Sequence, residues 1–302
     1  MTHLPSPPAR RPLGTSGIEV SALAWGNWRL CGDDVDAVVR LLHAALDAGI
    51  TLIDTADIYG PDNDEAFGAS EALLGRALAT DPSLRGKFVI ATKGGISMGV
   101  PYDSSASYIA SAIDASLERL GTDTVELWQI HRPDILTHPS EIAKAIDEAH
   151  KAGKIRSFGV SNFTTSQIAT LSQFLSVPIV STQPEFSPLR LAPLENGELD
   201  QAIAMDMAVL AWSPLGGGRI ANPADERTKA VAALLDKAAQ EHGVSRTAAA
   251  YSWIMAHPAR PIPIVGSQKP ERISEAADAL KVRWTRADWY AVLVASKGEP
   301  LP

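Results

Sequence analysis

Residues 35–60 read VDAVVRLLHAALDAGITLIDTADIYG and contain one complete unit of a repeating pattern. The apolar residues of 35–48 recur at helical spacing, so they share one face of an amphipathic helix. Gly49 follows, as expected where a helix ends in a left-handed residue. The apolar run 50–54 is too short for a helix and predicts a buried strand. The unit is a helix followed by a strand, with Asp54 at the strand's end and Tyr59 five residues later.

The same alternation runs through the whole chain and predicts an α/β fold with a parallel sheet. We favour one (β/α)8 TIM barrel over an open doubly wound sheet, because the glycine fingerprint of the latter is absent after the first strand. Two further helical segments, 246–256 and 286–296, exceed a minimal barrel and are expected on its outside or over one end. The eight expected strands are residues 19–25, 50–54, 88–92, 125–130, 155–160, 179–183, 208–212 and 262–265.

Composition and charge exclude several classes of partner. The 302 residues carry a formal net charge of -8, which argues against nucleic acid or an anionic membrane as partner. No apolar run of about 18 residues predicts a spanning helix. Cys31 is the single cysteine, which excludes an intramolecular disulfide and suits a cytoplasmic protein. Residues 1–12 are expected to form a flexible tail before one domain, 13–302.

Polar and reactive residues stand at the ends of the predicted strands. In a barrel of this kind the chemistry collects at the C-terminal ends of the strands. A free phenol such as Tyr59 has a pKa of about 10 and becomes a better acid beside a cation. Lys93 is the candidate cation, with Asp54 holding it in place. Strand ends carry, in chain order, Asp54, Lys93, His131, Ser161 with Asn162, Gln183, and Trp212 with Ser213.

These motifs resemble those of the aldo-keto reductases, and most closely a bacterial branch of predicted oxidoreductases that is YdhF-like. The resemblance covers nearly the whole chain and rests on DTADIYG, TKGG, IHRPD, KIRSFGVSNF and AWSPLGGGR. It implies the catalytic tetrad Asp54, Tyr59, Lys93 and His131. Tyr59 would donate a proton to a carbonyl oxygen while a nicotinamide supplies hydride, and His131 would orient that carbonyl. The implied activity is the reduction of aldehydes or ketones to alcohols.

The resemblance also implies a cofactor site for NADPH, with NADH possible. Ser161, Asn162 and Gln183 would bind the nicotinamide carboxamide, and Trp212 would stack on its ring. Arg272, helped by Lys269 or Ser267, would bind a 2′-phosphate. Gly266 and Ala276 depart from the residues that many relatives carry there. The full set implied for the cofactor is Gly26, Asn27, Asp54, Ser161, Asn162, Gln183, Trp212, Ser213, Leu215, Gly216, Gly217, Gly266, Ser267, Lys269, Arg272 and Glu275.

Trp28, Trp128, Tyr59 and His131 are expected on the substrate side, which reads as a shallow apolar site for a small carbonyl compound. A monomer without a metal ion is expected. One alternative is a redox sensor or regulatory subunit that uses the same barrel and cofactor with little turnover. A glycosidase with Glu126 and Glu185 lacks support because Glu126 lies inside a predicted strand. A metal enzyme at His131 and His138 lacks a third ligand.

Overall fold

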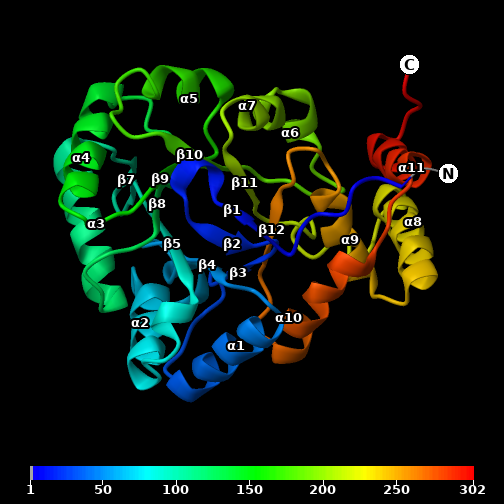
Figure 1. Cartoon of the computed structure of the whole chain (residues 1–302), viewed down its shortest axis with the longest axis horizontal. Helices are drawn as coiled ribbons and strands as arrows, with labels where there is room; N and C mark the ends of the chain where they lie inside the picture. Colours follow the sequence, from blue (N-terminus) through cyan, green and yellow to red (C-terminus); the bar gives the residue numbers. More distant parts are fainter. Residues whose placement is uncertain (1–2) are drawn as a thin grey trace.

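The fold is a closed barrel of eight parallel strands. In this computed structural model, which describes residues 3–302, neighbouring strands bond in the order β10-β11-β12-β3-β4-β5-β8-β9, and β9 closes the ring onto β10. Figure 1 looks down the axis of the barrel, with helices around its outside. The predicted barrel is confirmed. Its strands are β3 (Ala24–Gly26), β4 (Leu52–Asp54), β5 (Val89–Gly94), β8 (Leu127–Ile130), β9 (Phe158–Ser161), β10 (Ile179–Gln183), β11 (Ala208–Ala211) and β12 (Ile262–Val265).

Of the eight predicted strands, 179–183 and 262–265 keep their bounds, and two of the changes in the others bear on the site. The predicted strand 19–25 is two strands, of which β2 (Glu19–Ser21) lies outside the barrel and only β3 joins the ring. Ser21 and Thr51 exchange hydrogen bonds between backbone N–H groups and side-chain hydroxyls, 3.1 and 2.8 Å long, where the chain passes from one strand to the other. The third predicted strand continues past residue 92, so Lys93 lies within β5 rather than after it.

Alternation along each strand decides which side chains enter the barrel. Ala24, Leu52 and Ala91 belong to one buried cluster, whereas their sequence neighbours belong to a second, larger cluster that contains residues of the surrounding helices. Asp54 and Lys93 each lie two residues beyond a member of the first cluster and therefore share its side of the strand. The polar residues of β4 and β5 thus lie inside the ring at its C-terminal end.

A hairpin covers the other end of the barrel. Strand β1 (Arg10–Pro12) pairs with β2 in antiparallel register, and Leu13, Ile18 and Val20 pack into the same cluster as the inner barrel residues. Gly14 makes this approach possible, because a side chain there would collide with the Val180 carbonyl. The last three residues of the expected tail are therefore paired. Residues 1 and 2 lie outside the described residues.

Helices surround the ring in the order expected of βα units, and their bounds place the additions. Helix α9 contacts β12, whereas α8 packs against both α9 and α11, so Figure 1 shows α8 and α11 together beyond the ring. The prediction that 246–256 is an added helix is wrong, because α8 is the addition. The helices are α1 (Val35–Asp47), α2 (Ala69–Thr80), α3 (Ala106–Leu120), α4 (Pro139–Lys151), α5 (Thr165–Leu171), α6 (Ala192–Glu195), α7 (Glu198–Ala204), α8 (Glu226–His242), α9 (Arg246–Met255), α10 (Pro270–Ala276) and α11 (Arg286–Lys297).

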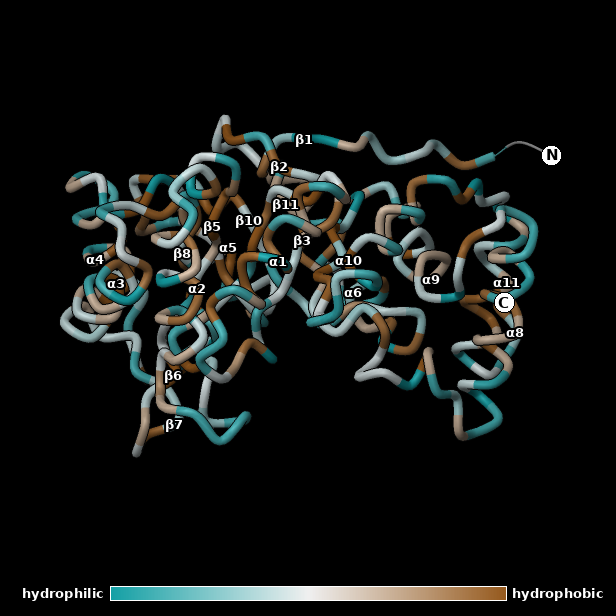
Figure 2. The backbone as a smooth tube through the Cα atoms, turned by 90° about the horizontal axis from the view of Figure 1, so that it is seen from below, coloured by the Kyte–Doolittle hydropathy of each residue, from teal (hydrophilic) through white to brown (hydrophobic). Residues whose placement is uncertain are grey.

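A second hairpin marks the end at which the polar residues collect. Strands β6 (Ile96–Ser97) and β7 (Val100–Tyr102) follow directly after β5. In the side view of Figure 2 they lie at the opposite end of the molecule from β1 and β2. Four short 3-10 helices complete the chain: Gly14–Ser16, Pro61–Asn63, Arg85–Lys87 and Ala277–Lys281. Among residues 3–302, no helix is both long and apolar enough to cross a membrane.

Candidate active site

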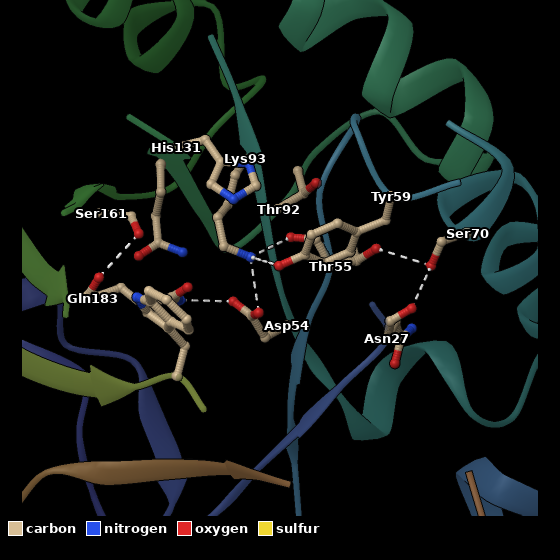
Figure 3. A network of polar contacts seen from close by, with 12 residues as sticks. Asn27, Asp54, Thr55, Tyr59, Ser70, Thr92, Lys93, His131, Ser161 and Gln183 are labelled. Carbon is tan, nitrogen blue, oxygen red and sulfur yellow. Dashed lines mark hydrogen bonds and ion pairs between the residues drawn. The ribbon is translucent and has the colours of Figure 1, made fainter. Parts of the chain in front are cut away.

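The ammonium group of Lys93 is the centre of the polar cluster inside the barrel. It donates hydrogen bonds to Asp54 Oδ2 at 2.8 Å, to the Thr55 carbonyl at 2.8 Å and to Tyr59 Oη at 3.1 Å. The Lys93 side chain is fully buried. The three acceptors use all three of its protons, which fixes the ammonium in one position. Figure 3 shows these three contacts converging on the lysine from one side.

Strand register explains why these residues meet. Asp54 lies opposite Ala91 across the β4–β5 pair, and Lys93 follows two residues later on the same face of β5. The second oxygen of Asp54 accepts a hydrogen bond from Gln183 Nε2 at 2.8 Å, so the carboxylate also links β4 to β10 across the ring. The pairing of Asp54 with Lys93 was predicted, whereas its contact with Gln183 was not.

Burial and charge act in opposite directions on the two catalytic candidates. Burial by itself lowers the pKa of Lys93, but Asp54 and Tyr59 more than compensate, and the pKa lies above its ordinary value. For Tyr59, burial raises the pKa, and this outweighs the lowering by Lys93. The sequence argument considered only the lysine and therefore expected a lowered pKa for this phenol. In the structure Tyr59 keeps its proton throughout the neutral range.

His131 lies directly after β8 and faces Tyr59. The two ring centroids are 5.8 Å apart and the rings meet edge to face. Burial lowers the pKa of His131 far below its ordinary value, and the charges of Lys93 and Arg132 lower it further. A neutral imidazole has one N–H to donate and one lone pair to accept. This ring is therefore able to donate a hydrogen bond to an oxygen without carrying a charge.

Four residues predicted for the nicotinamide end of the cofactor form one connected group beside His131. Asn162 Nδ2 donates to the His131 carbonyl at 3.2 Å and to Ser161 Oγ at 2.8 Å. Ser161 Oγ in turn donates to the Gln183 carbonyl at 2.9 Å, and Trp212 Nε1 donates to Asn162 Oδ1 at 3.0 Å. Asn162 has a left-handed backbone, with a φ of 60°, a conformation that asparagine tolerates better than most residues. The structure thus brings these four predicted residues together.

The loop after β11 holds the glycines that were predicted to surround a pyrophosphate. Ser213 Oγ accepts a hydrogen bond from the Gly217 N–H at 2.9 Å. Gly216 and Gly217 have φ values of 60° and 68°. A Cβ atom on Gly217 would have no neighbour within 4 Å, so its backbone is open to a ligand. Leu215 is partly buried against the large hydrophobic cluster and anchors the loop.

A pocket of about 530 Å³ lies beyond this loop. Lys269, Arg272 and Glu275, which were predicted for the adenosine end, line it. Sequence reasoning missed other lining residues, among them Asn222, Arg246 and Thr247. Gly266 and Ser267 lie nearby, where their carbonyls accept hydrogen bonds from Arg29 at 3.4 Å and from Trp25 at 3.0 Å. The lining includes three cationic side chains, two hydroxyl groups and one amide group, which suit a phosphorylated ribose.

Trp28 and Trp128, both predicted for the substrate side, differ in their exposure to solvent. Trp28 is 41% exposed and donates from Nε1 to Asp62 Oδ2 at 3.2 Å. Trp128 is fully buried in the cluster outside the barrel strands, so its assignment to the substrate side is wrong. Alternation along β8 sends Trp128 outward and Gln129 inward. Arg132, which sequence reasoning missed, is partly exposed, and its guanidinium lies 5.6 Å from the Trp212 ring centroid.

The remaining carboxylates considered for catalysis are engaged separately. Glu126 accepts hydrogen bonds from Arg85 at 3.2 Å and from the Ile90 N–H at 2.8 Å. Glu185 forms an ion pair with Arg190 at 3.5 Å. The two acids thus serve different local contacts, which gives no support to the glycosidase alternative.

Comparison with known proteins agrees with this geometry. The model of the aldo/keto reductase family matches residues 22–293. The chain belongs to the aldo/keto reductase family. Carbonyl reduction with a nicotinamide cofactor is the general reaction of this family, and the predicted activity is confirmed at that level.

Individual relatives cover the entire chain. It is 59% identical to 6-dehydroglucose reductase of Novosphingobium aromaticivorans over 100% of both chains. It is 35% identical to the oxidoreductase YdhF of Escherichia coli, over 97% of this chain and 99% of the other, which confirms the predicted branch. The structure of glycerol dehydrogenase from Gluconobacter oxydans superposes with a TM-score of 0.83 at 28% identity, over 97% of this chain and 98% of the other.

Proposed function

We propose that this aldo/keto reductase reduces the C6 aldehyde of a 6-dehydroglucose to the corresponding alcohol, with NADPH as hydride donor. The observation that carries the proposal is the 59% identity, over the full length of both chains, to a protein named for that activity. A second relative with the same name, from Agrobacterium fabrum, is 38% identical over 93% of this chain. The product, glucose, is an unphosphorylated sugar.

The polar surroundings of the site support a sugar rather than a purely apolar carbonyl compound. The charge of Arg132 acts to lower the pKa of His131 and opposes the rise in the pKa of Tyr59. This positive charge therefore lies close to the reacting groups. On the Trp28 side of the site, Asp62 accepts the indole N–H, and Asn63 Nδ2 donates to the Trp28 carbonyl at 2.7 Å. Hydroxyl groups of a sugar can exchange hydrogen bonds with such groups. The proposal of a sugar substrate thus departs from the expectation of an apolar substrate site.

In the proposed mechanism, Tyr59 is the proton donor and Lys93 holds its oxygen in place. A bound nicotinamide supplies the hydride. As negative charge develops on the carbonyl oxygen, Tyr59 Oη transfers its proton and the neutral His131 donates a hydrogen bond. Lys93 stabilises the phenolate that remains, and Asp54 keeps the ammonium charged. In the direction of alcohol oxidation, the phenolate of Tyr59 accepts the proton.

The residues present fit the cofactor. Ser161, Asn162 and Gln183 would hold the carboxamide, and Trp212 would lie beside the nicotinamide ring. Gly217 would offer open backbone to a pyrophosphate, with Ser213 and Gly216 beside it in the same loop. Lys269 and Arg272 line the 530 Å³ pocket and would pair with a 2′-phosphate, which would favour NADPH over NADH. We further propose that the protein is cytoplasmic and that it is a monomer. Light scattering during gel filtration tests the monomer.

The test is steady-state reduction of glucose 6-aldehyde, followed by the loss of NADPH absorbance. We expect kcat/KM for this substrate to exceed that for glyceraldehyde, a short aldehyde, by about 10-fold or more, since several hydroxyl contacts are lost in the smaller molecule. NADH is run in parallel. Equal kcat/KM values for the two aldehydes would reject the sugar proposal. Turnover with neither aldehyde, with cofactor that stays bound, would instead favour the redox-sensor alternative.

A further inference from the structure

A second polar cluster lies behind the catalytic lysine, between strand β5 and the helices α2 and α3. Its central residue is Asp57, which is 1% exposed. Both of its carboxyl oxygens are buried without a hydrogen-bond partner. Neither the proton transfer nor the cofactor contacts described above use this residue. A buried carboxyl group without partners is costly to keep, so its presence requires a physical reason.

Asp57 occupies the segment that carries the proton donor. Its backbone N–H donates to the Lys93 carbonyl at 3.0 Å. Its side chain reaches Gly94, the residue that follows Lys93 on β5. A Cβ atom on Gly94 would lie 3.0 Å from Asp57 Oδ2 and 2.8 Å from the Trp128 ring. The Asp57 carboxyl therefore packs directly on β5 one residue beyond Lys93. Trp128 Nε1 is likewise buried without a partner.

The first turn of α2 holds the same segment from the other side. Ser70 donates from its backbone N–H to the Tyr59 carbonyl at 3.1 Å and from Oγ to the Asn27 carbonyl at 3.0 Å. Figure 3 shows Ser70 between Asn27 and the segment of Thr55 and Tyr59. Glu71 is fully buried and accepts a hydrogen bond from Thr92 Oγ1, beside Lys93. Strand β5, the segment 54–59 and α2 are thus linked on the side of β5 away from the substrate.

The cations of this region are already paired. Arg119 forms an ion pair with Glu71 at 2.7 Å, and Lys93 forms one with Asp54 at 2.8 Å. An ionised Asp57 would be a buried anion beside Glu71 without a cation of its own, an arrangement that is strongly unfavourable. A protonated carboxyl avoids this charge.

We propose that Asp57 is a positioning residue that works as a neutral, protonated acid and holds the segment 54–59 on β5, so that Tyr59 stays within reach of Lys93. The residue touches neither the substrate nor the cofactor. Its loss acts on the rate through the placement of Tyr59. Its ionisation as the pH rises through the raised pKa disturbs the same packing, because the new charge would have to be solvated.

The electrostatic surroundings agree with a neutral acid. Burial raises the pKa of Asp57 well above its ordinary value, and the charge of Glu71 raises it further. Arg119 on α3, the backbone N–H of Ile58 and Lys93 on β5 act in the opposite direction without outweighing them. Tyr108 on α3 also faces Asp57, whose charge contributes to raising the pKa of that phenol. The titratable neighbours from all three packed elements are thus accounted for.

The first test measures stability against pH and needs no substrate. Asp57→Asn replaces a neutral acid by a neutral amide of the same shape. Because the pKa of Asp57 is higher in the folded than in the unfolded protein, the wild type loses stability as pH rises from about 4 towards the folded pKa. The Tm advantage of Asp57→Asn over the wild type should therefore grow by about 2–5 °C between pH 4 and pH 8. Asp33→Asn, at an exposed position, is the control. An advantage that does not change with pH would overturn the proposal.

The second test measures the rate. Asp57→Ala should lower kcat for aldehyde reduction about 10- to 100-fold, since small displacements of a catalytic group are costly. Its Kd for NADPH should stay at the wild-type value. Asp57→Asn should restore kcat at pH 7 and move the alkaline decline of kcat to higher pH. Wild-type kcat in a folded Asp57→Ala variant, or an alkaline decline unchanged in Asp57→Asn, would overturn the proposal. Both variants are compared with the wild type on whichever aldehyde it reduces, so the identity of the sugar does not enter.

Discussion

At the scale of single residues, burial decides the behaviour of the site as much as charge does. Lys93 and Tyr59 are 3.1 Å apart, and a sequence argument from their charges alone predicts a more acidic phenol. In the structure, burial raises the pKa of Tyr59 and lowers that of His131. The raised pKa keeps on Tyr59 the proton that the proposed mechanism transfers to the substrate. The lowered pKa of His131 keeps the imidazole neutral, so that it donates a hydrogen bond without competing as an acid.

Tyr59→Phe tests the proton donor. The substitution removes one hydroxyl group and leaves the packing of the ring, so kcat for reduction should fall by about 10²–10⁴-fold. NADPH binding, followed by quenching of tryptophan fluorescence, should persist. Tyr108→Phe serves as the control, because its hydroxyl donates to the Ile96 carbonyl instead. Activity of Tyr59→Phe near that of the wild type would exclude Tyr59 as the donor.

The depressed pKa of His131 predicts a particular pH profile. Since the folded pKa lies well below 6.5, the imidazole is already neutral at pH values where an exposed histidine titrates. Plots of kcat against pH should therefore show no inflection from His131 between about pH 5 and 7. His131→Gln should lower kcat but leave the shape of the profile unchanged in this range. An inflection present in the wild type and lost in the variant would contradict the assignment.

At the scale of secondary-structure elements, local chemistry fixes where helices begin and end. Helix α8 begins with Asp225, whose side chain accepts from the Thr228 N–H while Thr228 Oγ1 accepts from the Asp225 N–H. Helices α3 and α8 end at Gly121 and Gly243 in the left-handed conformation. The sequence carries these signals openly, which is why the helix predicted over 35–48, with Gly49 after it, is observed as α1 over nearly the same residues.

Asp225→Ala separates the added helix from the catalytic site. Loss of this cap should lower the free energy of unfolding by about 1 kcal/mol. Because α8 packs against α9 and α11, kcat at moderate temperature should stay unchanged. The measurement combines thermal unfolding with steady-state rates, and Glu226→Ala, an exposed position in the next residue, is the control. A large loss of kcat in a folded Asp225→Ala variant would show that α8 influences the site.

At the scale of the whole molecule, the barrel brings residues from distant parts of the chain to one end. The pocket lined by Lys269 and Arg272 also includes Asn222, from the segment between β11 and α8, and Arg246, the first residue of α9. Sequence reasoning found the 266–275 wall because its motif is contiguous. It missed Asn222 and Arg246 because nothing in the sequence around them indicates which pocket they line. Arg246 itself is bound to Asp236 by two hydrogen bonds of 2.7 and 2.6 Å.

Arg272→Ala tests the proposed phosphate contact in this pocket. A guanidinium that pairs with the 2′-phosphate should contribute to NADPH binding and much less to NADH binding. The Kd for NADPH is expected to rise about 10-fold or more, with a change of less than about 3-fold for NADH. Arg283→Ala, on the segment that lies between the 3-10 helix Ala277–Lys281 and α11, is the control. Equal losses for both cofactors would reject the phosphate role.

The amino-acid sequence by itself determined the repeated helix–strand unit, the number of barrel strands and the residues at the strand ends, because apolar periodicity and capping act over short distances. It also determined that Asp54, Tyr59, Lys93 and His131 belong together, because parallel strands end on one face. Only the tertiary structure decided that β2 leaves the barrel, that α8 rather than α9 is the added helix, and that Trp128 points away from the substrate. It likewise decided the pKa directions and the placement of Asp57 behind Lys93. These depend on burial and on contacts between segments that are distant in sequence, which no local pattern records.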